Sequence, residues 1–289
     1  MQCISPKFII DQDTLTQLLH RPGYAKHYVV RDPENGQLLG FCATYLSYVD
    51  RAGEKLIASL AVMLIPPANR SKGIGLSLHT HGISSLKKTR GVVALQLGSI
   101  YPRIFYGPPF DMYINEHWFE RRGWKLNSGL AQDLILACDD WPTSVNLPAT
   151  DNIIYQQCTQ DKMDEVLLLV EKAAARQSKT GWFDQYWSLM DSPNVRDILI
   201  GIGNGSIVAA ALTYTPGSQV SSNLPWAALV GSEVGGITCV CLRRKCCFGF
   251  LSIEKLLYSV RTPGSCKLIE VSCNSGRFLP CYVGKYHKQ

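Results

Sequence analysis

The stretch with the clearest capacity for chemistry is IPPANRSKGIG, residues 65–75. Two prolines end an apolar run, and Gly73 and Gly75 then open a segment with helical spacing. A strand that passes through a glycine turn into a helix presents several unpaired N–H groups to one point, which suits phosphate oxygens. Arg70 and Lys72 add positive charge at the rim. The stretch is either an ordinary strand-to-helix turn or a phosphate cradle.

Two other phosphate-binding motifs do not match this chain. A P-loop requires G-x-x-x-x-G-K-[ST] before a helix, and no such stretch is present. The dinucleotide motif requires G-x-G-x-x-G, whereas GIGNGS at residues 201–206 has its glycines at the wrong spacing. Its Asn-Gly pair favours a hairpin turn instead.

The elements expected around the turn form an α+β (α/β layered) fold built on a mixed central sheet flanked by helices. The Asn35-Gly36 pair predicts a hairpin, and the apolar run before the two prolines predicts a long strand. In chain order we expect a hairpin (residues 26–50), a long strand (55–65), a helix (75–91) and a buried strand (92–99). A loop (100–113), a short helix (114–124) and a last strand or strands (124–140) follow.

A weak internal repeat indicates a second copy of this fold. An amphipathic helix at residues 161–178 is followed by two strands around Asn204-Gly205, in the place that Asn35-Gly36 occupies in the first half. The repeat stops after Leu242, because no second glycine turn and helix follow. The predicted organisation is a complete domain (residues 1–139), a linker (140–152), a partial second domain (153–242) and a divergent basic, Cys-rich tail (243–289).

Charge and cysteine content differ between the tail and the rest of the chain. The tail holds nine Lys and Arg residues against two glutamates, so the rest of the chain is nearly neutral. This distribution does not favour a nucleic-acid partner, because the excess of Lys and Arg lies in the tail and not on the main body of the chain. Seven of the eleven cysteines follow residue 238 at irregular spacings, which favours free thiols over a zinc site. We expect no bound metal.

The apolar segments are too short for a membrane span. None approaches roughly 18 uninterrupted apolar residues, and the first twenty residues lack the basic and apolar regions of a signal peptide. We therefore expect a cytoplasmic, intracellular protein with no membrane partner.

The glycine turn resembles the coenzyme A loop of the GNAT superfamily of N-acyltransferases, Q/R-x-x-G-x-G/A. It stands here as Arg70-Ser71-Lys72-Gly73-Ile74-Gly75, with Pro67 three residues before the arginine. The family's terminal F-Y-E-K-x-G-F block is similar to WFERRGW at residues 118–124. The likeness covers residues 25–137 with both motifs and residues 153–242 more faintly. The tandem order also resembles the acetyltransferase region of fungal glycosidase-fused proteins.

This resemblance implies a GNAT-like acyl-CoA N-acyltransferase fold in two tandem copies, with acetyl-CoA as the cofactor. The acetyl-CoA would lie along the strand at residues 58–65, with backbone groups near Leu64 and Ile65 on its pantetheine arm. Its pyrophosphate would lie at the turn. The resemblance thus implies the cofactor-binding residues Leu64, Ile65, Arg70, Ser71, Lys72, Gly73, Ile74, Gly75 and Ser77.

The chain departs from the family at the proton donor for the thiolate. The family's tyrosine is replaced by Phe119, which has no proton to give. Tyr113 is the catalytic candidate, and Tyr101 and Tyr106 are alternatives; for each ring, packing against the cofactor or the core is the more common role. Three carboxylates remain as possible bases for the amine: Glu54, Asp111 and Glu116.

Two histidines and an aromatic segment are further candidates for site residues. His79 and His81 are two positions apart on the expected helix, so they point to different faces and do not form a joint metal site. The aromatic residues of GWFDQYWSLMD, residues 181–191, either line an acceptor pocket or pack as a helix; packing is the more common role.

The resemblance implies direct attack of a neutral primary amine on the thioester, with a small-molecule or peptide amine as the acceptor. A lysine-like amine is protonated at pH 7, so a base or a water path must remove its proton. The alternative is a catalytically silent acyl-CoA-binding or scaffolding protein, which Phe119 and the missing second turn favour.

Overall fold

Two β-sheets organise the chain, one of four strands and one of six. The computed structural model describes residues 10, 12–21, 24–99, 101–105, 107, 113–125, 132–137, 153–177, 181–214, 218, 234–243 and 267–272. Side chains are described for these residues apart from 113–115, 132–137, 176–177, 234 and 267–272. The chain divides into two compact units, which are described separately below.

The first unit comprises residues 1–126, 174–185 and 222–229. Its sheet has the order β1-β2-β3-β4, in which β1, β2 and β3 are antiparallel and β4 lies parallel to β3. A parallel pair requires a crossover connection, and here that connection contains α2. The elements are α1 Gln12–Leu19, β1 Ala25–Arg31, β2 Leu38–Tyr48, β3 Leu56–Leu64, the 3₁₀ turn Pro67–Asn69, α2 Ile74–Lys87, β4 Val92–Leu97 and α3 Tyr113–Glu120.

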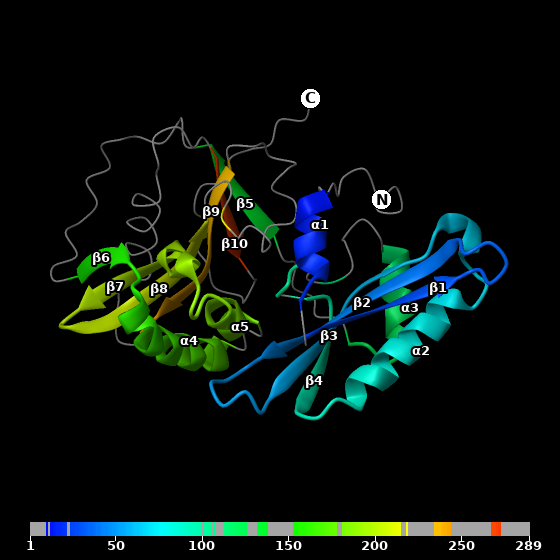
Figure 1. The fold of residues 1–289 in the computed structure, drawn as a ribbon, viewed down its shortest axis with the longest axis horizontal. Helices are drawn as coiled ribbons and strands as arrows, with labels where there is room; N and C mark the ends of the chain where they lie inside the picture. The colour runs from blue at the N-terminus through cyan, green and yellow to red at the C-terminus, as the bar shows by residue number, and fades with distance from the viewer. Residues whose placement is uncertain are drawn as a thin grey trace. The chain divides into compact units, whose positions relative to one another are not determined.

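Alternation along β2 supplies apolar side chains to both faces of this sheet. Cys42 packs with Leu60 and with Leu78 of α2, whereas Ala43 and Tyr45 pack on the other face with Leu18 of α1. Figure 1 shows α2 lying along the sheet, in agreement with its contacts to β1, β2 and β3. Helices thus cover both faces, as predicted for a layered α+β fold.

Gly40 of β2 allows α2 to lie close to the sheet, whereas Gly82 of α2 is not crowded. A Cβ on Gly40 of β2 would come within 2.8 Å of Ile65 Cδ1 and 2.9 Å of Leu78 Cδ1. A Cβ on Gly82 of α2 would lie 3.5 Å from Cys42 Sγ, in ordinary contact. The Gly40 position therefore sets how closely the helix and the end of β3 pack.

The second unit comprises residues 127–173, 186–221 and 230–289. Its sheet has the order β5-β10-β9-β8-β7-β6. Tyr186 donates a 2.9 Å hydrogen bond to the carbonyl oxygen of Cys239, and Glu165 Oε1 accepts one of 2.8 Å from the Ile207 N–H. The elements of the second half of the chain are β5 Gln132–Ala137, β6 Ile153–Gln157, 3₁₀ turn Gln160–Lys162, α4 Met163–Gln177, α5 Trp182–Trp187, 3₁₀ turn Pro193–Asp197, β7 Ile198–Gly203, β8 Ser206–Tyr214, β9 Val234–Leu242 and β10 Lys267–Ser272.

Strand β5 has a different partner from the one expected. The sequence predicts it as the last strand of the first sheet, but it pairs antiparallel with β10 in the second unit. Strand β10 lies in the tail, where no element was predicted, and it pairs on its other side with β9 in parallel. Both segments form strands because of their local apolar pattern, but the partner of a strand depends on distant backbone.

The hairpin predictions are confirmed. Asn204 and Gly205 have φ angles of 51° and 73°, as a type I′ turn between β7 and β8 requires. Gly36 has a φ of 70° in the connection between β1 and β2. In the part of the chain that the structure describes, no helix is long and apolar enough to cross a membrane.

Candidate functional site

Two residues in the left-handed conformation shape the turn between β3 and α2. The 3₁₀ turn begins after Pro66, whose carbonyl oxygen accepts a 2.8 Å hydrogen bond from the Asn69 N–H. Ser71 then has a φ of 61° and Gly73 one of 80°. A Cβ on Gly73 would meet no atom within 4 Å, so glycine is favoured there by backbone conformation and not by crowding.

No side chain in the described part of the chain caps the N-terminus of α2. Gly73 is the N-cap, and the Ser77 N–H donates to its carbonyl oxygen at 3.0 Å. The N–H groups of residues 74–76 precede this bond and have no carbonyl oxygen within the helix to accept them. The first turn contains no acidic residue, so no carboxylate there offsets the positive end of the helix dipole. This helix end is suited to an anion.

The polar side chains of the turn lie at the surface. Ser71, Lys72 and Ser77 are exposed, and so is Arg70, whose Nε donates a 3.2 Å hydrogen bond to the carbonyl oxygen of Ile65. A guanidinium has five N–H donors, so this bond leaves others for an anion. The structure thus places the predicted phosphate-binding residues on one short turn.

Strand β3 opens next to this turn. Its pairing with β4 ends at Leu60 and Leu97, and the Gly98 N–H donates a 2.8 Å hydrogen bond to the Leu60 carbonyl oxygen. Ala61 and Val62 then pack on the same face of the sheet, and the register with β2 shifts at this point, which marks a β-bulge. Among the described residues, β3 continues beyond it to Leu64 beside β2 only. No described strand therefore pairs with the edge of residues 61–64 that faces away from β2, and this edge, which leads to Ile65, suits an extended ligand.

The segment after β4 packs against the turn through one tryptophan. Trp118 Cζ2 of α3 lies 3.7 Å from the point that a Cβ on Gly75 would occupy. The Arg122 guanidinium carbon lies 3.5 Å from the centroid of the Trp118 ring, and Arg122 Nη1 donates a 2.6 Å hydrogen bond to the Trp118 carbonyl oxygen. The predicted terminal block WFERRGW therefore lies beside the glycine turn.

His79 lies at the centre of the aromatic residues of this block. It is buried, and its ring makes edge contacts with Trp118 and Trp124 at centroid distances of 5.6 and 6.2 Å. Trp124 Nε1 donates a 2.9 Å hydrogen bond to His79 Nε2. His81 is exposed and contacts Tyr28 instead. The prediction that the two histidines point to different faces is confirmed, and His79 has a packing partner that the sequence did not predict.

Phe119 packs in the core cluster of Cys42, Leu60 and Leu78, at a centroid distance of 6.4 Å from His79. Its position therefore provides packing and no proton. Burial, followed by the positive charges of Arg122 and Lys87, lowers the pKa of His79 below its ordinary value.

The proposed acids and bases are only partly described. Tyr113 is the first residue of α3, but its side chain lies outside the described residues, as do Tyr106 and Asp111 entirely. Glu116 is half-buried on α3. Glu54 is exposed just before the start of β3, about 26 Å of strand from the turn, and is not brought to the site.

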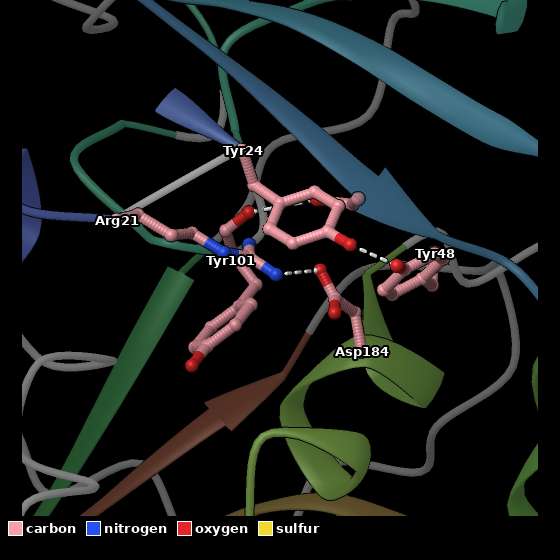
Figure 2. A network of polar contacts seen from close by, with 6 residues as sticks. Arg21, Tyr24, Tyr48, Tyr101 and Asp184 are labelled. Atoms are coloured by element: carbon pink, nitrogen blue, oxygen red, sulfur yellow. Dashed lines mark hydrogen bonds and ion pairs between the residues drawn. The ribbon is translucent and has the colours of Figure 1, made fainter. Parts of the chain in front are cut away.

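Tyr101 belongs to a polar cluster that the sequence did not predict (Figure 2). The Arg21 guanidinium lies over the Tyr101 ring at 4.6 Å and over the Tyr24 ring at 5.3 Å. Arg21 Nη2 also donates to Asp184 Oδ2 at 2.5 Å, and the Tyr24 and Tyr48 hydroxyls are hydrogen-bonded to each other. This cluster is part of the first unit. It joins residues that are up to 163 positions apart, so no local pattern could have revealed it.

The environment of this cluster shifts the pKa values of two members. Asp184 is 1% exposed, and burial raises the pKa of its carboxyl in spite of the Arg21 charge. The hydrogen bond with Tyr24, and to a smaller extent burial, raises the pKa of Tyr48 to about 12. The neighbouring aromatic residues Trp182 and Phe183 are buried, which agrees with their predicted packing role.

In the described part of the chain, no three His, Cys, Asp or Glu residues are grouped so as to hold a metal ion. Four described cysteines are buried and are not in a disulfide bond: Cys42, Cys158, Cys239 and Cys241.

Comparison with known proteins identifies the fold. No protein-family model matches the sequence, and no curated protein is detectably similar to it. The GCN5-related glucosamine N-acetyltransferase region of a fungal multi-domain GH3 β-N-acetylglucosaminidase matches with a TM-score of 0.77 at 23% identity, over 90% of this chain and 32% of that one. This chain thus spans about a third of the fungal protein.

Two further structures match along most of their length. A tandem GNAT protein from the clavulanic acid biosynthesis pathway has a TM-score of 0.51 at 14% identity, over 91% of this chain and 80% of that one. A GCN5-related N-acetyltransferase from Sphaerobacter thermophilus has a TM-score of 0.50 at 15% identity, over 88% and 74%.

With the β3 opening, the glycine turn and these matches, the chain has the fold of a GNAT N-acetyltransferase. More particularly, it has the tandem form of that fold, because the matches extend over about 90% of its length. The predicted fold class and the resemblance to the fungal acetyltransferase region are both confirmed.

Proposed function

We propose that the protein is an acetyl-CoA-dependent N-acetyltransferase that transfers the acetyl group to a primary amine. One observation carries this proposal. The open edge of β3 at residues 61–64 leads directly to the uncapped N-terminus of α2, through a turn held by Gly73. An extended strand edge suits the amide groups of a pantetheine arm, and a helix N-terminus suits a pyrophosphate.

The residues that would hold the cofactor differ in what they offer. Leu64, Ile65, Ile74 and Gly75 offer backbone groups, because their side chains are apolar or absent. Ser71, Arg70, Lys72 and Ser77 offer exposed polar side chains to phosphate oxygens. Gly73 permits the turn itself. The thioester of acetyl-CoA would supply the acetyl group.

The acceptor amine must reach the thioester in its neutral form. A primary amine with a pKa near 10.4 is mostly protonated at pH 7, so a base or a water path must take its proton before attack. The departing thiolate must then gain a proton, and Tyr113 is the proposed donor. Small-molecule and peptide amines are the proposed acceptor class. Glucosamine is the first amine to test, because the fungal region of similar fold is described as a glucosamine N-acetyltransferase.

A catalytically silent acyl-CoA-binding protein is the second candidate, and one observation favours it. Phe119 occupies the position of the family's tyrosine and is packed in the core cluster of α2 and the sheet. A protein with this substitution can keep the binding turn and lack the proton donor.

Calorimetry with acetyl-CoA tests the shared part of both candidates. We expect the wild type to bind and Gly73→Glu to lose binding, because the variant strains the turn and adds a negative charge where phosphate would lie. Gly205→Glu is the matched control: Gly205 also has a positive φ and open space around its Cβ, but it lies in a turn of the second unit. Loss of binding in both variants, or no binding by the wild type, would contradict the proposal.

Thiol release with a panel of amines then separates the candidates. Release of CoA that depends on an amine, with glucosamine, polyamines and a peptide as acceptors, supports the enzyme. Binding of acetyl-CoA without thiol release for any acceptor supports the silent protein.

A further inference from the structure

We propose that His79 is a positioning residue whose neutral imidazole fastens the α3 segment to α2, so that Trp118 stays against the cofactor turn, and that protonation of His79 releases this segment. The inference rests on the proposed function for its effect on cofactor binding. The fastening itself rests on geometry alone and is tested without a cofactor.

The Trp124 hydrogen bond determines the protonation state of His79. An indole N–H can only donate, so His79 Nε2, 2.9 Å from Trp124 Nε1, must accept. The imidazole is therefore neutral, with its proton on Nδ1. A protonated imidazole has an N–H at both nitrogens, and two donors would then face each other inside a buried contact.

This bond joins two parts of the proposed site. His79 lies on α2, six residues after Gly73, and Trp124 lies after the end of α3. Between them, Trp118 contacts the His79 ring and also lies at Gly75, next to the uncapped helix end. The two ends of the contact therefore hold the α3 segment beside the phosphate-binding turn.

The surroundings favour the neutral form. Burial lowers the pKa of His79 most. Among the described residues, the positive charges of Arg122, in the turn after α3, and of Lys87, on α2, lower it further, so the neutral form persists below the ordinary value of 6.5. The contribution of the bond is present above that pH and is lost as the pH falls through the lowered pKa.

NMR of the intact chain without cofactor tests the fastening. Histidine ¹⁵N spectra should show His79 with an unprotonated Nε2, and the Trp124 indole N–H, assigned with Trp124→Phe, should shift with a midpoint below pH 6.5. The Trp118 indole signal should move at the same midpoint in wild type and not in His79→Gln. A Trp118 signal that does not shift when His79 titrates, or a His79 with its proton on Nε2, would overturn the proposal.

Binding of acetyl-CoA as a function of pH tests the consequence. His79→Gln offers an amide oxygen near the place of Nε2 and does not titrate. This variant should therefore bind acetyl-CoA well at pH 7.5 and should lose less affinity than wild type when the pH is lowered to 5.5. Wild type should lose about tenfold more affinity over that range, since a buried donor is left unpaired. His79→Leu should bind weakly at both pH values.

His81→Gln is the matched control, because it removes an exposed imidazole from another face of α2. It should follow the wild-type pH profile, which also includes any protonation of the cofactor's own phosphates. Parallel loss of affinity in wild type and His79→Gln overturns the proposal. If no variant binds acetyl-CoA at any pH, the proposed function fails, and the NMR titration alone decides the role of His79.

Discussion

Arg21 and Asp184 form a 2.5 Å ion pair within the first unit, although 163 residues separate them in the chain. Arg21 precedes β1, whereas Asp184 lies on α5, beyond the linker predicted at residues 140–152. Figure 2 shows the Arg21 guanidinium between the rings of Tyr24 and Tyr101, with the Asp184 carboxylate at its end. The first unit therefore includes residues from the second half of the chain.

Removal of one partner of this pair should destabilise the protein strongly. The side chains of Asp184 and Arg21 are 1% and 14% exposed, respectively. Asp184→Asn alone leaves the Arg21 guanidinium without its ion partner, and Arg21→Met alone leaves the Asp184 carboxyl without its partner. Each should cost about 3–5 kcal/mol of unfolding free energy. The double variant Arg21→Met with Asp184→Leu should cost less than either single change. Urea unfolding measures all three, and an additive double variant would show that the pair is uncoupled.

A larger side chain in place of Gly40 should disturb both the fold and the glycine turn between β3 and α2. A Cβ there would meet Ile65, Ile74 and Leu78 at 2.8–2.9 Å, so Gly40→Val must displace α2 or the end of β3. We expect a loss of about 1–3 kcal/mol in unfolding free energy and weaker acetyl-CoA binding. Gly107→Val, where a Cβ has no neighbour within 4 Å, is the control for thermal unfolding and calorimetry. Equal effects at the two positions would argue against close packing at Gly40.

Loss of the exposed charges on the turn should weaken cofactor binding in a salt-dependent way. Arg70→Gln with Lys72→Gln removes two cations from beside the uncapped helix end. We expect about tenfold weaker acetyl-CoA binding at low salt, and a smaller difference near 1 M salt because of screening. Calorimetry at both salt concentrations measures this. A difference that does not change with salt would mean that the two side chains act by shape and not by charge.

A tyrosine at position 119 should raise turnover if the chain lacks a general acid that protonates the departing thiolate. Phe119→Tyr keeps the ring in its core cluster and adds a hydroxyl. General acid catalysis is worth about 10²–10⁴-fold, so amine-dependent thiol release should rise at least tenfold with unchanged acetyl-CoA affinity. Phe41→Tyr, on the opposite face of the sheet, should have no such effect. An unchanged rate would show that Phe119 does not lie where the thiolate leaves.

The tyrosine pair should make stability fall at alkaline pH. The pKa of Tyr48 is raised from 10.0 to about 12, chiefly by its hydrogen bond with Tyr24. The folded state thus holds this proton more tightly than the unfolded chain, and the stabilisation is present below pH 10 and lost as the pH rises from there towards 12. The unfolding free energy of wild type should fall more steeply between pH 9.5 and 11.5 than that of Tyr48→Phe. Parallel slopes would contradict the assignment.

Much of the first unit is predictable from local patterns. The apolar run before Pro66 gives β3, the glycines at 73 and 75 mark the start of α2, and the Asn-Gly pairs give both hairpins. The helix α1 was not predicted, although the spacing of Leu15, Leu18 and Leu19 carried the signal. The glycine turn between β3 and α2 was predicted because its backbone conformation depends on adjacent residues, which a short sequence motif can specify.

The remainder depends on contacts between distant residues. The sequence by itself determined the order of the strands of the first sheet and of α2, the glycine turn and the departure at Phe119, since each follows from neighbouring residue types. Only the tertiary structure decided that β5 pairs with β10, that Asp184 meets Arg21, and that His79 accepts the Trp124 indole. These contacts join segments 45–163 residues apart. Their partners are selected by burial and by the need to pair buried polar groups, and a local sequence pattern does not contain this information.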